Sequence, residues 1–367
     1  MVFNDSSSFV QYLRGTTAAV LIAAAFGTAY TASAQDKTPP AVQNAPSSPM
    51  TGAGADAAKA ALARASAAVS KATASGAAAV VSLKPVAGSS AANTFMWEVS
   101  SKTTKVYLYG TIHVGKSSFY PLPAVVEDAF MAANNLVVEA DISVDTSSAE
   151  ARKIVIYPPN TNLEKATSPA LYARVKAQLQ RYEMAPDAVR LLKPYMVGGL
   201  LSMAEMTRLG YDSSYGVDGY FLEAAHRTKK PIIELESQIG QIKMLDGLAP
   251  DLQIAYLENA VLSLESAKTT EQIAALVSAW QEGDAIKVEA VAKQTAALYR
   301  LNDAIDEKII FERNIKMTEK IVAFLKTDQT YFIAVGALHL VGRRGLLEAL
   351  RTKGFQVAQK QAGEGLK

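Results

Sequence analysis

Two apolar segments of the chain end in the same short motif, Gly-x-x-His. The first segment begins at Val106 and ends at His113, and the second begins at Tyr331 and ends at His339. Short unbroken runs rich in Val, Ile, Tyr and Phe are typical of buried β-strands. A helix-like stretch and then another short apolar run follow each motif, at 122–133 and 136–140 in the first case and at 345–352 and 355–358 in the second. The pattern therefore predicts strand, Gly-x-x-His, helix and strand, twice.

The remaining periodicity predicts a long helical section between these two units. Apolar residues recur there at three- and four-residue spacing, as expected for amphipathic helices, in 171–182, 186–208, 218–228, 251–266, 270–282, 284–298 and 303–325. One further strand at 231–236 interrupts the helices, and a strand at 95–99 forms a hairpin with the first motif strand. The expected fold is α/β, with a mixed central sheet from two related halves and a large helical insertion.

The first 92 residues have a composition that does not predict a packed domain. An apolar run at 16–29, preceded by Arg14 and followed by Ala32-Ser33-Ala34, is typical of a secretory signal peptide, which we place at 1–34. Residues 35–92 are rich in Ala, Ser and Pro and predict a disordered linker. The domain itself is expected at 93–362. We therefore expect an exported protein, periplasmic or secreted, without stable membrane insertion after cleavage.

Composition excludes several classes of protein. The sequence has no cysteine, so neither a disulfide scaffold nor a thiolate metal site is expected. A net charge of +2 leaves no polybasic face for nucleic acid, and 49% hydrophobic residues suffice for a large core.

Histidine is the rarest candidate for chemistry, with three in 367 residues. His113 and His339 follow strands, where open α/β sheets place ligand sites. If they meet, they form a metal site or an acid/base pair; the alternative is that each merely caps its own strand. His226 lies at a solvated helix end, and we leave it out of the site.

Several other polar residues fall at positions that predict burial. Glu139 and Glu236 close apolar strands, and Glu139 is either part of a site or a turn carboxylate. Glu234 shares the face of Glu236, and of these two we expect Glu234 to be the surface charge. Arg313 and Asn314 flank the inward stripe of the last long helix, so the guanidinium needs either a substrate oxyanion or a strand-end glutamate. The spacing favours Asp218 as a helix N-cap.

These residues belong to motifs that resemble the TraB/PrgY/GumN family, which includes the TIKI metalloproteases. The motifs are Phe95-Met-Trp-Glu-Val, Tyr107-Leu-Tyr-Gly-Thr-Ile-His-Val-Gly-Lys, Tyr120-Pro-Leu-Pro, Leu136-Val-Val-Glu-Ala-Asp, Tyr215-Gly-Val-Asp, Glu234-Leu-Glu-Ser, Glu312-Arg-Asn and Val335-Gly-Ala-Leu-His-Leu. The resemblance implies a fold akin to ChaN-like proteins and erythromycin esterases (EreA-like). It also implies a metal site at His113, His339 and Glu139, with Glu236, Arg313 and Asn314 at matching motif positions.

The leading hypothesis is a divalent-metal-dependent hydrolase that cleaves a peptide or protein substrate. The two histidines would ligate Mn, Co, Fe or Zn, and Glu139 would be a third ligand or the general base. Arg313 would stabilise the oxyanion, oriented by Asn314 and Glu236. The alternatives are a haem- or peptide-binding protein, or a non-catalytic accessory protein in envelope polysaccharide biosynthesis.

Overall fold

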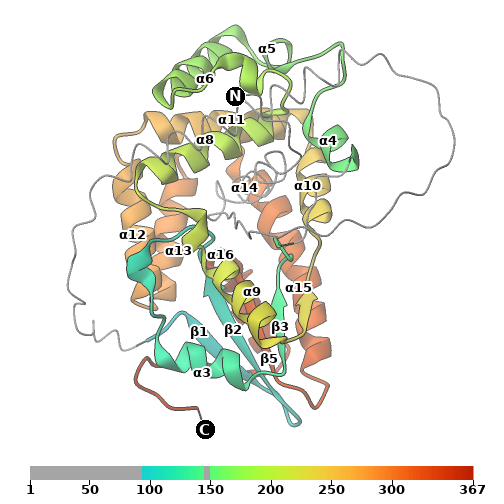
Figure 1. Cartoon of the computed structure of the whole chain (residues 1–367), viewed down its shortest axis with the longest axis vertical. Helices are drawn as coiled ribbons and strands as arrows, with labels where there is room; N and C mark the ends of the chain where they lie inside the picture. Colours follow the sequence, from blue (N-terminus) through green and yellow to red (C-terminus); the bar gives the residue numbers. More distant parts are fainter. Residues whose placement is uncertain (1–92, 144–148, 367) are drawn as a thin grey trace, which may run out of the picture.

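The structure is a computed structural model that describes residues 93–143 and 149–366. The predicted signal peptide and linker, residues 1–34 and 35–92, lie outside the described residues. Within the described ranges, sheet and helices form two connected parts, with the sheet at one end and most helices at the other (Figure 1).

Six strands form one mixed sheet in the order β4-β3-β5-β2-β1-β6. They are β1 (Met96–Ser100), β2 (Lys105–Thr111), β3 (Asn135–Val138), β4 (Ile232–Glu234), β5 (Tyr331–Gly336) and β6 (Gln356–Gln359). The strands β4, β3, β5 and β2 are parallel, whereas β1 pairs antiparallel with both β2 and β6. The predicted hairpin and the mixed sheet are therefore confirmed.

Helices cover the sheet and share its hydrophobic core. They are α3 (Ala124–Ala132), α9 (Val217–Thr228), α12 (Thr269–Gln281), α15 (Glu312–Phe324) and α17 (Leu346–Thr352). The rings of Phe221 on α9 and Phe130 on α3 lie 4.7 Å and 5.7 Å from the ring of Phe332 on β5. Figure 1 shows α3 and α9 in front of the sheet. The central strands are mainly apolar because side chains from both faces are buried.

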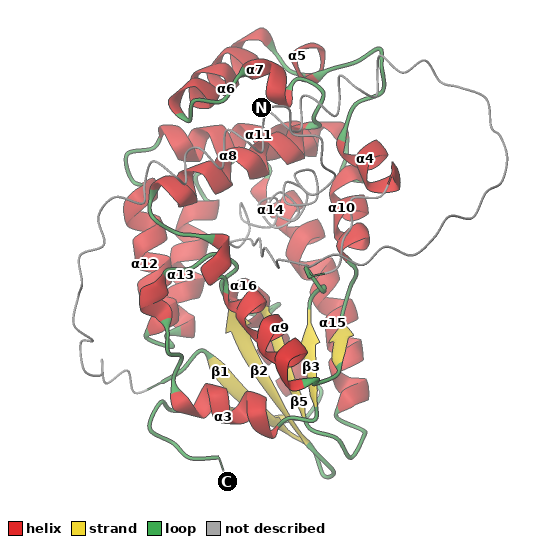
Figure 2. Cartoon of the chain, viewed as in Figure 1, coloured by secondary structure: helices red, strands yellow, loops and turns green. Residues whose placement is uncertain are grey.

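A second hydrophobic core lies within the helical part. Its helices are α4 (Ala149–Val155), α5 (Leu163–Ala166), α6 (Pro169–Arg181), α7 (Pro186–Val189), α8 (Pro194–Arg208), α10 (Gln238–Asp246), α11 (Pro250–Glu265) and α14 (Asn302–Asp306). The remaining elements are the helix α13 (Ala285–Ala296) and the short turns η1 (Ser117–Phe119), η2 (Ser213–Tyr215), the π-helical turn η3 (Glu307–Phe311) and α16 (Ala337–Leu340). The arrowheads of β2 and β3 point toward this helical part in Figure 2.

Two predicted helices are interrupted. The range 186–208 is divided because Pro194 has no N–H to continue a helix and instead begins α8 at its first position. The range 303–325 contains the π-turn η3 between α14 and α15. Pro194 could have marked the first break in the sequence, whereas no residue in the pattern marks the π-turn. None of the helices in the described ranges combines the length and hydropathy that a membrane span requires.

Candidate functional site

The four parallel strands end side by side, and each is followed by a polar residue at the same edge of the sheet. In sheet order these residues are Glu236 after β4, Glu139 after β3, His339 after β5 and His113 after β2. The backbone ladder continues past β4, since the Glu236 amide donates to the Glu139 carbonyl oxygen over 2.7 Å. Because neighbouring strands are about 4.8 Å apart, side chains at successive positions in this order come within reach of one another.

Gly336, the glycine of the second motif, leaves room for this cluster. A Cβ atom at Gly336 would lie 3.1 Å from Glu139 Oε1 and 3.4 Å from His113 Nε2. The Gly336 amide donates to Glu139 Oε1 over 2.7 Å, and His339 Nε2 lies 3.6 Å from the same oxygen. A side chain at position 336 would therefore occupy the space that the two imidazoles and the carboxylate share.

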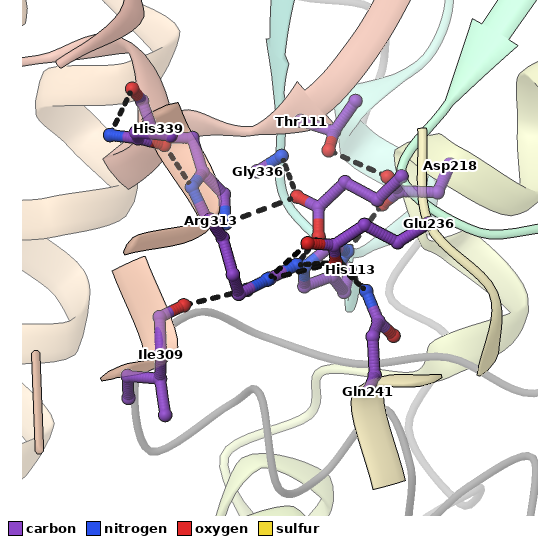
Figure 3. Close-up of polar contacts among 11 residues, drawn as sticks. Thr111, His113, Asp218, Glu236, Gln241, Ile309, Arg313, Gly336 and His339 are labelled. Atoms are coloured by element: carbon purple, nitrogen blue, oxygen red, sulfur yellow. Dashed lines mark hydrogen bonds and ion pairs between the residues drawn. The ribbon is translucent and has the colours of Figure 1, made fainter. Parts of the chain in front are cut away.

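Asp218, the second residue of α9, contacts His113 at Nδ1, on the side of the ring away from the cluster. Asp218 Oδ2 lies 2.7 Å from His113 Nδ1, and Asp218 Oδ1 accepts a hydrogen bond from the Thr111 hydroxyl over 2.7 Å. An ionised Asp218 accepts a hydrogen bond from the N–H at Nδ1 of His113. The lone pair of this imidazole is then on Nε2, on the side of the ring that faces the cluster (Figure 3). Our prediction that Asp218 is an N-cap is wrong: the N-cap is Gly216, and Asp218 is a buried partner of the histidine.

Asn314 holds His339 in the same way. Its Nδ2 donates to the carbonyl oxygens of His339 and Arg344, so Oδ1 is its acceptor and lies 2.6 Å from His339 Nδ1. This orientation requires a proton on Nδ1 and puts the lone pair of His339 on Nε2. Both imidazoles thus present Nε2 to the carboxylate of Glu139.

Arg313 lies between the two strand-end glutamates. Its Nη2 donates to Glu139 Oε2 over 2.7 Å, its Nε donates to Glu236 Oε2 over 2.9 Å, and its Nη1 donates to the carbonyl oxygen of Ile309 over 2.7 Å. Of the two partners that the sequence left open, the structure pairs this guanidinium with strand-end glutamates (Figure 3). The Ile309 carbonyl belongs to the π-turn η3, and such turns are frequent at functional sites.

Burial and neighbouring charges set the protonation of the cluster. Burial lowers the pKa of His113 to about 3 and that of His339 to about 4, so both imidazoles are neutral at neutral pH. Burial alone would raise the pKa of Glu139, but His339, Arg313 and the Gly336 amide outweigh it and hold the pKa at about 2. Since His339 is neutral above pH 4, Arg313 and the amide keep Glu139 ionised at neutral pH. Burial raises the pKa of Asp218 to about 7.

Gln241, on α10, is a contact that the sequence did not reveal. Its Nε2 lies 3.4 Å from Glu139 Oε2 and 3.3 Å from Glu236 Oε2. No motif marks this glutamine, whereas Asp218 lies in the motif Tyr215-Gly-Val-Asp, which marks the residue but not its partner. His226 is exposed and its Nε2 contacts Ser143, away from the cluster. Glu234 is exposed as well, so it is a surface carboxylate as we expected.

The two Gly-x-x-His segments differ after their strands. His339 lies in the helical turn α16, which begins directly after Gly336. His113 lies in an irregular segment in which the Gly115 amide donates to Asp212 over 2.9 Å, next to η2. The shared motif therefore brings two imidazoles to one place through different backbone conformations.

The donor atoms of the cluster have the chemistry of a divalent-metal site. Neutral imidazoles and a carboxylate are the ligands that Mn, Fe, Co and Zn accept. Histidines that bind a metal usually donate their other ring N–H to a nearby acceptor, and here Asp218 and Asn314 accept from the Nδ1 atoms. Two ligands of a tetrahedral ion lie about 3.4 Å apart for bonds of about 2.1 Å, against 3.6 Å between His339 Nε2 and Glu139 Oε1. Across residues 93–143 and 149–366, however, no group of three or more His, Asp or Glu side chains is arranged to hold a metal ion.

Known proteins resemble this chain over most of its length. The model of the TraB/PrgY/gumN family matches residues 95–359. The uncharacterized protein YbaP of Escherichia coli is 28% identical over 247 residues, which cover 67% of this chain and 87% of YbaP. Metalloprotease TIKI1 of Danio rerio is 25% identical over 327 residues, covering 76% of this chain and 65% of that protein, and human TIKI1 is 24% identical with 75% and 63% covered. No solved structure matches.

Proposed function

We propose that this chain, which belongs to the TraB/PrgY/gumN family, is an exported hydrolase that uses a divalent metal ion to cleave a peptide bond. The relatives named metalloproteases support hydrolysis of a peptide bond. They are about a quarter identical and longer than the matched region, so their activity reaches this chain only as part of the proposal. The signal-peptide pattern at 1–34 supports export.

One observation carries the proposal: two neutral imidazoles and one ionised carboxylate face the space beside Gly336. His113 and His339 present Nε2, and Glu139 presents Oε1. Nothing in the packing of the sheet requires these buried polar groups to converge, and desolvating them costs free energy. A ligand that all three bind would offset that cost.

A metal ion bound there would supply Lewis-acid activation of water and of the scissile carbonyl. His113 and His339 would hold it, and Glu139 is better suited to the role of third ligand than to that of general base. Its carboxylate already accepts hydrogen bonds from Arg313 and from the Gly336 amide, and both interactions stabilise the ionised form and weaken it as a base.

The other four polar residues position these three groups. Asp218 and Asn314 each fix the ring of one histidine through Nδ1. Arg313 donates from Nε, Nη1 and Nη2 to protein acceptors, so we assign it to the orientation of Glu139 instead of the oxyanion role that we predicted from the sequence. Glu236 is the second carboxylate that pairs with the guanidinium of Arg313.

The decisive experiment measures metal content by elemental analysis after purification, chelation and reloading with Mn, Fe, Co or Zn. We expect about one equivalent in the wild type and its loss in His113→Ala and His339→Ala, because each removes one of three ligands. The matched control is His226→Ala, which removes the one histidine outside the cluster and should bind metal like the wild type. Digestion of a peptide library should then occur only with the reloaded wild type and the control.

Equal metal content in the wild type and both cluster variants would refute the metal site. A Soret band on addition of haemin that both cluster variants lose would instead favour the haem-binding alternative. Metal binding without cleavage of any peptide would favour a binding or accessory role over hydrolysis.

A further inference from the structure

A cavity of about 440 Å³ lies in the helical part of the molecule. It is lined by α8, α11, α12, α13 and α14 together with the turn η3, and its volume is within the range of small-molecule sites, about 300–1,000 Å³. The wall is mainly apolar, with side chains such as Met206, Leu276, Val291 and Ile309. An apolar cavity of this size suits a ligand that is itself largely hydrocarbon.

This cavity is separate from the histidine cluster, although the two share a wall. Leu338 and Val341 line the cavity, whereas His339 between them faces Glu139. The helical turn α16 therefore divides the two spaces. None of the residues of the cluster lines the cavity.

Most charged side chains in the wall of the cavity already have a partner. Glu205 is paired with Arg208, and Glu289 is paired with Lys293. Asp306 accepts a hydrogen bond from Asn302, and its pKa is raised to about 6 by burial. These carboxyl groups do not favour an anion beside them.

Arg343 is the exception, at the exposed part of the wall. It is exposed to solvent, and among residues 93–143 and 149–366 it has no ion-pair or hydrogen-bond partner. The adjacent Arg344, by contrast, pairs with Glu307 and lies 4.1 Å over the ring of Phe311. A guanidinium that is unpaired within the described part of the chain and lies next to an apolar interior is complementary to a molecule with an anionic head and an aliphatic body.

We propose that this cavity binds one aliphatic chain with an anionic head group, of the fatty-acid class, with the chain inside and the head at Arg343. The proposal does not depend on hydrolysis, because no residue of the histidine cluster takes part in the binding.

Titration calorimetry of the full chain with dodecanoate tests it, with 1-dodecanol and dodecyltrimethylammonium as the neutral and cationic counterparts. We expect one saturable site that prefers dodecanoate. Arg343→Ala should weaken dodecanoate binding about tenfold and leave dodecanol binding unchanged. The matched control is Arg351→Ala on α17, which removes another exposed arginine outside the cavity and should bind like the wild type.

A bulky side chain inside the cavity gives a second test. Ala292→Trp and Ala296→Trp fill the space from α13 and should abolish dodecanoate binding, whereas Ala297→Trp, next to Ala296 but outside the cavity, should not. Thermal melting checks that each variant is folded, and one folded filling variant is sufficient. His113→Ala should bind dodecanoate normally, which separates this result from failure of the metal site.

Absence of saturable binding would overturn the proposal, as would binding that persists in a folded filling variant. Equal affinity for all three amphiphiles would overturn the anionic class. A dimer in sedimentation velocity that the filling variants disrupt, without dodecanoate binding, would show that a second copy of the chain occupies the cavity.

Discussion

Replacement of Arg313 by methionine removes the cation that lies between two glutamates and retains much of the aliphatic volume. The side chains of Arg313 and Glu139 are 5% and 7% exposed, and that of Glu236 is 17% exposed. Removal of the guanidinium therefore leaves a buried carboxylate at Glu139 with no cationic partner and a better hydrated one at Glu236.

The expected loss of stability follows from this burial. Breaking a buried ion pair by removing one partner costs about 3–5 kcal/mol, because the remaining charge is left in a poorly polarisable environment. Most of that cost belongs to Glu139, since water reaches Glu236. The loss is a large fraction of the total of about 5–15 kcal/mol expected for a protein of this kind.

Urea unfolding followed by circular dichroism, at neutral pH and in excess chelator, measures the effect without a contribution from metal binding. The triple variant Arg313→Met, Glu139→Gln, Glu236→Gln removes all three charges, so we expect it to recover stability to within about 2 kcal/mol of the wild type. Arg174→Met is the matched control: its pair with Glu265 is about one third exposed on both sides and should contribute less than about 1 kcal/mol.

A loss of less than about 1 kcal/mol in Arg313→Met would refute the reasoning. So would a triple variant no more stable than Arg313→Met, because the cost would then not arise from unpaired charge.

Three further predictions concern stability and use urea midpoints. Gly336→Ala should destabilise the protein by about 1–3 kcal/mol, because its Cβ would lie only 3.1 Å from Glu139 Oε1. Gly219→Ala should stabilise it by about 0.5–1 kcal/mol, because Gly219 lies within helix α9 and a Cβ there would meet no other atom within 4 Å. Equal effects of the two variants would contradict this. Trp280→Phe loses the buried hydrogen bond from Nε1 to the Gly110 carbonyl and should cost about 1–3 kcal/mol, and an unchanged midpoint would show that the bond contributes nothing. The pKa of Asp306 is raised from 3.8 to about 6, so its ionisation opposes folding above pH 6 and not below about pH 4. Above pH 6 we therefore expect Asp306→Asn to be more stable than the wild type by about 1–2 kcal/mol. A difference in stability that persists on acidification would be inconsistent with this cause.

Much of the candidate site follows from local pattern. A continuous apolar run predicts a strand, and a polar residue just after it belongs at the edge of the sheet, so His113, Glu139, Glu236 and His339 could each be placed at a strand end. The inward stripe of the last long helix likewise placed Arg313 and Asn314 toward the protein. The metal and peptide-bond chemistry of these residues remains a prediction.

Other features depended on which segments become neighbours. Asp218 lies 105 residues from His113 in the sequence, and a helix-start carboxylate has the same local pattern whether it caps its own helix or binds a distant imidazole. Gln241 carries no pattern at all. Pro194 is visible in the sequence and could have marked the first helix break, but only backbone geometry reveals the π-turn.

The sequence by itself determined the strands, most of the longer helices and the four strand-end polar residues, because hydrophobic periodicity reflects burial within a few residues. Only the tertiary structure decided that β5 lies between β3 and β2, which puts His339 between Glu139 and His113, and that the two glutamates share one guanidinium. Strand order and ion pairing depend on packing between distant segments, since Arg313 lies 77 residues from Glu236 and 174 from Glu139, and no local window of sequence contains both partners.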